Sequence, residues 1–94
     1  VDLYETPEAI RVTAELAGVD EDDVEILLFD DAVVIEGTRI LPACEGEALY
    51  HAATIRQGPF RLAVPLPAAV DTGAVEARLE RGLLFVTLPR LVRR

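Results

Sequence analysis

The sequence predicts an all-β domain, a sandwich of two antiparallel sheets, on three observations. Seven or eight short runs alternate between apolar and polar residues, as in strands that bury one face. Turn signals recur between these runs at regular spacing. No apolar stripe at helical spacing extends beyond a turn or two. The 94 residues are enough for one small domain with one core, spanning residues 1–94.

The first part of the chain is predicted to contain two strands and a turn. Residues 2–6 form a short extended segment, stopped by Pro7, that is marginal unless another strand pairs with it. Residues 9–16 alternate cleanly and predict a half-buried antiparallel strand. Its core face carries Ile10, Val12, Ala14 and Leu16. At residues 20–23 we expect a capped turn, in which the Asp20 side chain accepts hydrogen bonds from the N–H groups that follow.

The next two strands, residues 24–29 and 32–37, form a hairpin with Asp30-Asp31 as its turn. One face of the first strand carries Val24, Ile26 and Leu28. The outer side of the pair also carries apolar side chains, those of Leu27, Phe29 and Val34. Either a second layer covers them or they form an exposed patch.

A third hairpin is predicted at residues 75–89, after a turn at residues 71–74. Its own turn is Arg81-Gly82, where glycine supplies the positive φ that residues with side chains avoid. The apolar faces carry Val75, Ala77 and Leu79 before the turn and Leu84, Val86 and Leu88 after it. Both strands therefore offer an apolar face to a common core.

Residues 38–50 are predicted to form a long loop. The segment has no clear period and contains Pro42 and Gly46, and at about a dozen residues it has a length that compact domains tolerate mainly for a function. It holds Cys44, the only cysteine, so an intrachain disulfide is excluded. Oxidative crosslinking of two chains is one interpretation of this thiol, and an incidental surface cysteine is the favoured one.

Charge and composition exclude several classes of function. The formal net charge of −8 repels phosphate backbones, so no nucleic acid is expected as a partner. The acidic stretches at residues 20–25 and 30–31 indicate solubility and turn formation, because the ligand order and central Gly of an EF-hand calcium site are missing. No apolar run is long enough to cross a bilayer and no signal-peptide pattern is present. We therefore expect a soluble, cytoplasmic protein without a membrane partner.

Catalytic chemistry is not expected. The chain has no serine, one histidine (His51) and one cysteine, which excludes the usual hydrolase triads and metal clusters. Glu76 and Glu80 fall on the outer face beside Arg78, as solvated charges rather than an acid–base pair. No Gly-rich phosphate loop is present. We expect no enzyme activity, no metal and no cofactor, and binding remains as the function.

The third hairpin also carries a pattern that resembles a family signature. Ala77 is followed, after three residues, by a polar residue, Gly82 and two aliphatics that end at Leu84. This resembles the A-x-x-x-N-G-V-L signature of the small heat shock proteins (Hsp20 family). Arg81 replaces the family's Asn and Leu83 its Val. Because Arg is less comfortable than Asn at positive φ, the change favours a different turn type.

Further motifs extend the resemblance over nearly the whole chain in the same order. They are Tyr50-His51, Gly58-Pro59-Phe60-Arg61 and Pro65-Leu66-Pro67, which resemble the family's Tyr-His, Gly-x-Phe-x-Arg and Leu-Pro patterns. Leu62 stands where the family has its Arg, and residues 52–55 replace the family's charged run. We therefore expect a dimer to depend more on apolar contact and strand pairing than on the family's ion pairs.

The resemblance implies an α-crystallin domain, an immunoglobulin-like β-sandwich of two antiparallel sheets. It implies an ATP-independent holdase for partly unfolded client proteins that forms a homodimer, or a larger oligomer where flanking arms are present. In bacterial and plant members the loop, here residues 38–50, carries a strand that pairs with the first strand of a partner subunit. The implied dimer contacts are Leu3, Tyr4, Ile40, Leu41, Leu49, Tyr50 and Arg61.

The resemblance also implies a groove that accepts an extended Ile-x-Ile tail peptide or client segment. Its walls are Val24, Ile26, Leu28, Val75, Ala77 and Leu79. From the residues alone, ordinary core packing of these six side chains is equally well supported. Leu27 and Phe85 are outer-face candidates for client contact, with packing under a partner subunit as the alternative. A rival function is that of a β-sandwich co-chaperone adaptor, which binds one folded partner.

Overall fold

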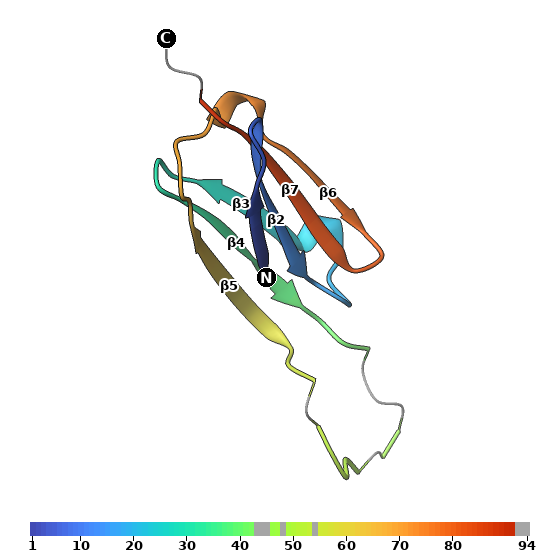
Figure 1. Cartoon of the computed structure of the whole chain (residues 1–94). Helices are drawn as coiled ribbons and strands as arrows, with labels where there is room; N and C mark the ends of the chain where they lie inside the picture. The colour runs from blue at the N-terminus through green and yellow to red at the C-terminus, as the bar shows by residue number, and fades with distance from the viewer. Residues whose placement is uncertain (43–45, 48, 54, 92–94) are drawn as a thin grey trace.

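Two antiparallel sheets face each other in the computed structural model of the chain, which describes residues 1–42, 46–47, 49–53 and 55–91 (Figure 1). The four-stranded sheet has the order β1-β2-β7-β6 and the three-stranded sheet the order β3-β4-β5. The strands are β1 (Asp2–Glu5), β2 (Ala9–Glu15), β3 (Val24–Leu28), β4 (Ala32–Arg39), β5 (Gly58–Pro65), β6 (Glu76–Glu80) and β7 (Leu83–Pro89). Two single 3-10 turns, η1 (Glu21–Asp23) and η2 (Thr72–Ala74), precede β3 and β6. The predicted β-sandwich is confirmed.

The core lies between the sheets and follows the alternation of the strands. In the register of β2 and β7, Ile10 lies opposite Leu88, and both side chains are fully buried. From the facing sheet, β4 contributes Val33 and Ile35, which are also fully buried. Leu62 lies opposite Ile35 on β5 and packs against this core. Position 62 therefore faces the core, where an apolar side chain such as that of Leu62 is favoured.

The outer face of the three-stranded sheet carries the second set of apolar side chains in β3 and β4. Val34 is only 3% exposed, whereas Leu27 and Phe29 are 36% and 50% exposed. Of the two alternatives open from the sequence, a covering layer or an exposed patch, the structure therefore favours an exposed patch at Leu27 and Phe29.

The β6–β7 turn keeps the conformation that the resemblance predicts for an Asn-Gly pair. Arg81 has a φ of 53° and Gly82 a φ of 78°, and Glu80 lies opposite Leu83, so the turn is a two-residue type I′ turn. The expectation that Arg81 favours a different turn type is wrong. The hairpin demands positive φ at this position, and the Gly82 carbonyl accepts a 2.7 Å hydrogen bond from the backbone N–H of Leu16.

The two expected turns differ in their capping. Asp71 accepts a hydrogen bond from the backbone N–H of Gly73 at 3.1 Å, as a side-chain cap does. Asp20 makes no such side-chain bond, so the prediction for its carboxylate is wrong. Its backbone carbonyl instead accepts from the N–H of Asp23 at 2.9 Å, which closes the single turn η1.

An arm joins β4 to β5 and projects from the sandwich (Figure 1). It comprises residues 40–57, because β4 continues through Thr38 and Arg39, which pair with Pro59 and Gly58. The arm thus begins two residues later than the predicted loop and continues beyond residue 50. The molecule measures 65 × 20 × 20 Å along its principal axes. Cys44 lies outside the described residues.

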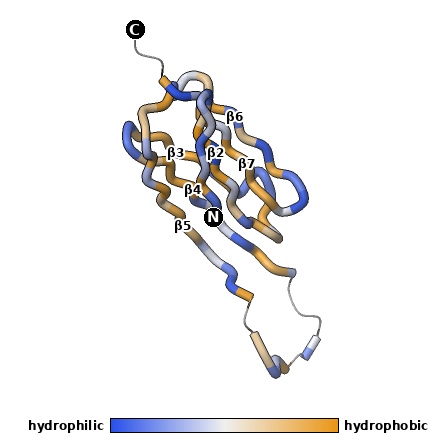
Figure 2. Tube along the Cα trace, in the orientation of Figure 1, coloured by the Kyte–Doolittle hydropathy of each residue, from blue (hydrophilic) through white to orange (hydrophobic). Residues whose placement is uncertain are grey.

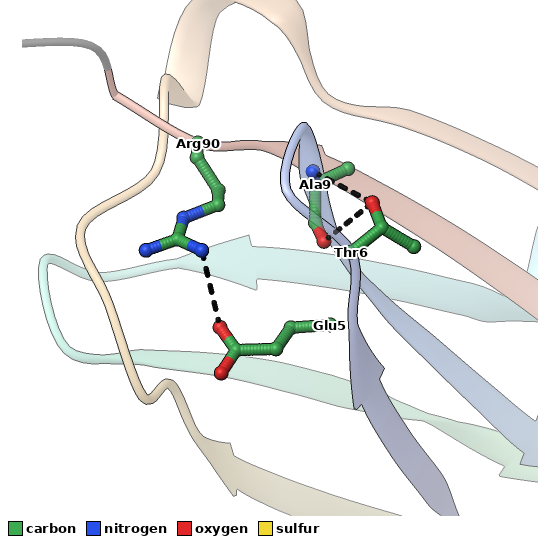
Figure 3. Close-up of polar contacts among 4 residues, drawn as sticks. All are labelled: Glu5, Thr6, Ala9 and Arg90. Atoms are coloured by element: carbon green, nitrogen blue, oxygen red, sulfur yellow. Dashed lines mark hydrogen bonds and ion pairs between the residues drawn. The ribbon is translucent and has the colours of Figure 1, made fainter.

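Polar contacts at Glu5 and Thr6 hold the end of β1 that lies away from the arm (Figure 3). Thr6 Oγ1 accepts a 3.1 Å hydrogen bond from the backbone N–H of Ala9 and lies 3.3 Å from its carbonyl, to which it donates. Arg90 Nη1 lies 3.5 Å from Glu5 Oε2. These contacts hold the short strand against β2, which supplies the partner that the sequence requires for it.

Candidate functional site

The sandwich has an open seam between β3 and β6, the edge strands of the two sheets on this side. A pocket of about 160 Å³ lies in the seam. It is lined by Glu21, Val24, Ile26, Ala77, Arg78, Leu79 and Leu84. Four of the six predicted groove residues therefore meet in one place, and we call this seam the β3–β6 groove.

The groove is apolar because the inward faces of both edge strands meet there. Ala77 lies opposite Val86 and Leu79 opposite Leu84, so all four belong to the inner face of the four-stranded sheet. Leu84 is buried, Leu79 is half-buried and Ala77 is exposed. The single methyl group of Ala77 leaves room that a larger side chain would fill.

The other two predicted groove residues, Leu28 and Val75, do not line the pocket. Val75 directly precedes β6, and both side chains are half-buried and pack against the core. None of the six predicted side chains is fully buried. The two sheets therefore do not cover these six side chains completely, which was the alternative left open by the sequence.

The edges of the groove are also open to backbone pairing. β6 pairs only with β7, and β3 pairs only with β4, so each has one edge without a strand partner among the described residues. An edge strand presents N–H and C=O groups that an extended peptide can pair with. The site therefore combines a hole for an aliphatic side chain with a template for peptide backbone.

The rim of the groove is charged. Glu21 lines one end, and Arg78 lines the β6 side. The Arg78 guanidinium carbon lies 4.7 Å from the centre of the Phe85 ring, and its Nε lies 3.4 Å from Glu80 Oε2. Arg78 therefore half-covers Phe85, the predicted client contact, which faces outward on β7. Leu27, the second predicted client contact, is exposed on the outer face of β3.

The predicted dimer contacts fall on β1, the arm and β5. Leu3 and Tyr4 are 42% and 53% exposed on β1, a strand whose outer edge is unpaired among the described residues. On the arm, Leu41 is half-buried and the other three are exposed, namely Ile40, Leu49 and Tyr50. Arg61 lies on β5 with its Nε 3.8 Å from Glu36 Oε2.

The arm carries an apolar hollow of its own, of about 270 Å³. It is lined by Leu41, Tyr50, Ala52, Ala53, Ile55 and Gln57. Figure 2 shows hydrophobic residues recurring along the arm, outside the sandwich core. The predicted loop ends at residue 50 and so leaves out Ile55. An isolated apolar residue before a strand is the signal that could have identified it.

The described residues do not build a metal centre. Among them, no three His, Cys, Asp or Glu side chains come together in a way that could hold a metal ion. His51 is exposed on the arm. Within the part of the chain that the structure describes, no helix has the length and apolar character needed to span a membrane.

Comparison with known proteins places these features in context. A model of the Hsp20/alpha crystallin family matches residues 2–94. The chain is 38% identical over 89 residues to spore protein SP21 of Stigmatella aurantiaca, which covers 95% of the chain and 53% of that protein. It is 34% identical over 92 residues to the 17.8 kDa class I heat shock protein of Arabidopsis thaliana, which covers 97% of the chain and 59% of that protein.

A solved structure shares the fold of this chain. Heat shock protein 16.0 from Schizosaccharomyces pombe superposes with a TM-score of 0.85 at 29% sequence identity. The match covers 99% of the chain and 86% of that structure. The chain therefore spans nearly all of this structure but little more than half the length of the two curated relatives, at 53% and 59%.

Proposed function

Because this chain belongs to the Hsp20/alpha crystallin family, we propose that it is an ATP-independent holdase, which binds partly unfolded proteins and prevents their aggregation. The single observation that carries the proposal is the β3–β6 groove, an apolar pocket between two edge strands with open backbone edges. Such a site accepts extended, aliphatic chain, which folded proteins bury and unfolding proteins expose.

The groove suits weak and reversible binding. A pocket of about 160 Å³ has room for aliphatic side chains but not for a folded surface. Burying two aliphatic side chains of an Ile-x-Ile segment contributes roughly 3 to 6 kcal/mol before the cost of ordering the peptide. Binding of this strength can be released without nucleotide. We therefore propose no enzyme activity, no cofactor and no metal for this function.

A strand-exchanged homodimer is the proposed assembly. β1 has an unpaired outer edge with exposed Leu3 and Tyr4, and the arm presents an apolar hollow that includes Leu41 and Tyr50. Pairing the arm of one subunit with β1 of the other would cover both surfaces at once. Flanking arms, where present, would extend the dimer to a larger oligomer.

Client contact outside the groove is proposed at two outer-face side chains. Leu27 is exposed beside Phe29, and Phe85 lies under the Arg78 guanidinium, which can move aside at little cost because exposed charge contacts are weak. The acidic balance of the chain argues against nucleic acid as a partner. We propose the cytoplasm as its location.

One assay tests the function directly. Unrelated client proteins are heated with and without the chain, and aggregation is followed by light scattering while a sizing column reports the assembly. A holdase suppresses aggregation of several clients at near-stoichiometric amounts. Unchanged scattering for every client, together with tight binding of one folded protein, would overturn the holdase proposal and support an adaptor.

A further inference from the structure

A hollow of about 480 Å³ lies where the arm joins the sandwich, and we call it the arm-base hollow. Arg39, Arg56 and Arg61 line it, together with Gln57 and Glu15. The chain carries nine Lys and Arg residues against seventeen Asp and Glu. The chain is negatively charged as a whole, but the three arginines make the surroundings of this hollow positive.

Arg39 has hydrogen-bonding capacity that its surroundings leave unused. Its Nη1 donates a 3.4 Å hydrogen bond to the backbone carbonyl of Arg56. Its Nε is buried and has no hydrogen-bond partner among the residues that the structure describes. A buried donor without an acceptor is costly, and a guanidinium presents its donors in a fork that matches a carboxylate. The position therefore suits an oxyanion that the described residues do not supply.

Of the three arginines, only Arg61 is paired with a carboxylate of the described residues. Arg61 is held at 3.8 Å by Glu36. The other ion pairs of the described residues join Arg78 to Glu80 and Arg90 to Glu5, so none of them includes Arg39 or Arg56. Glu15 lines the arm-base hollow but forms no ion pair with either arginine. Among the described residues, no carboxylate therefore pairs with these two guanidinium groups.

The first strand has a pattern that complements the base of the arm. β1 reads Asp2, Leu3, Tyr4, Glu5, so alternation places Asp2 and Tyr4 on one face, about 7 Å apart along the strand. The arm-base hollow adjoins the apolar hollow of the arm, because both are lined by Gln57. Glu5 is engaged by Arg90, whereas Asp2 forms no ion pair with the described residues.

We propose that the arm-base hollow receives the Asp2 carboxylate of a second copy of the chain, with Arg39 and Arg56 as its ligands, while Tyr4 of that copy enters the apolar hollow of the arm. The inference rests on the proposed strand-exchanged dimer and adds to it a charged contact that sets its register. The Asp2 contact can be distinguished from strand pairing itself, because backbone hydrogen bonds between strands do not depend on side-chain charge.

The test measures the dimer dissociation constant of the 94-residue chain by sedimentation equilibrium. The variants are Arg39→Gln, Asp2→Asn and the two combined, with Arg81→Gln as a control that removes one exposed positive charge from the β6–β7 turn, away from β1 and the arm. Each of the first two is expected to weaken the dimer about tenfold, because a charge-assisted hydrogen bond is lost. The combination is expected to weaken it no further, because both changes remove the same contact. The control should stay within about twofold of the unmodified chain.

The outcomes separate the two proposals. A dimer that is as tight in Arg39→Gln as in Arg81→Gln, or losses that multiply in the combined variant, would overturn the Asp2 contact while leaving the dimer standing. An unmodified chain that stays monomeric at every concentration would overturn the dimer and the contact together. Thermal unfolding of each variant, expected to match that of the unmodified chain, excludes loss of fold as the cause.

Discussion

Ala77 and Val86 lie directly opposite each other on β6 and β7 and share the inner face of the sheet, yet Val86 is 1% exposed and Ala77 is exposed. The difference follows from position in the sheet. β7 is flanked by β2 and β6, whereas β6 is the last strand and lies at the open seam. An inward-facing residue on this edge strand therefore borders the β3–β6 groove instead of the core.

Enlarging the side chain at position 77 should close the groove. Ala77→Trp is expected to weaken binding of an Ile-x-Ile peptide at least tenfold, because the indole is comparable in size to the 160 Å³ pocket. Fluorescence anisotropy of a labelled peptide measures the affinity. Ala63→Trp, on the exposed outer side of β5, is the matched control and should leave affinity unchanged. Equal affinity of the two variants would place peptide binding elsewhere.

A side chain at Gly37 should destabilise the domain. Its Cβ would overlap the backbone carbonyl oxygen of Asp23 and lie 3.0 Å from the Phe60 ring. Gly37→Ala is therefore expected to cost about 1 to 3 kcal/mol of unfolding free energy, measured by urea denaturation. In the control Gly73→Ala the Cβ meets only Asp71 Oδ1, at 3.5 Å, so little change is expected. Similar losses in both variants would contradict this account.

The strained turn residue Arg81 offers a stabilising substitution. Its φ of 53° lies in the left-handed region, which Asn tolerates better than other residues with side chains. Arg81→Asn should raise the unfolding free energy by about 0.5 to 1 kcal/mol, which corresponds to a few degrees in Tm for a domain of this size. Arg81→Val should lower Tm, because a β-branched side chain is least compatible with positive φ. A calorimetric scan that finds the reverse order would contradict the turn assignment.

The proposed dimer depends on the exposed apolar residues of β1. Tyr4→Glu should shift the chain toward monomer, because Tyr4 is 53% exposed on an unpaired edge and would have to be desolvated in the interface. Light scattering coupled to size exclusion measures the mass. Phe29→Glu, at a side chain 50% exposed on the three-stranded sheet, is the control and should leave the dimer intact. If Phe29→Glu dissociates the dimer and Tyr4→Glu does not, the interface lies on the three-stranded sheet, which would contradict the proposed dimer.

The strands in which apolar and polar residues alternate strictly were predicted from the local sequence pattern. The burial of Ile10 and Leu88 follows from period-two alternation, which is a property of neighbouring residues alone. The extension of β4 through Thr38 and Arg39 was not predictable in this way, because these residues are held by pairing with Pro59 and Gly58, about twenty positions away. Long-range pairing therefore decided where the arm begins.

The turn and the groove also depend on the fold in ways that the local sequence does not predict. Arg81 adopts a conformation that its own preference opposes, because the hairpin around it fixes the turn. Alternation placed Ala77 and Leu79 on an inward face, but only the order of strands in the sheets reveals that this face borders the seam. Arg39 lies 17 positions before Arg56 in the sequence, and their spacing gave no signal of a shared hollow. Arg39 and Arg56 meet because β4 and β5 pair.

The most direct test of the account is a methyl NMR titration of the unmodified chain with an Ile-x-Ile peptide. The groove hypothesis predicts saturable shifts at Val24, Ile26 and Leu79, which line the pocket, and none at Val33 or Val64, which are buried in the core on β4 and β5. Shifts confined to the arm, or no saturation at any concentration of peptide, would contradict it.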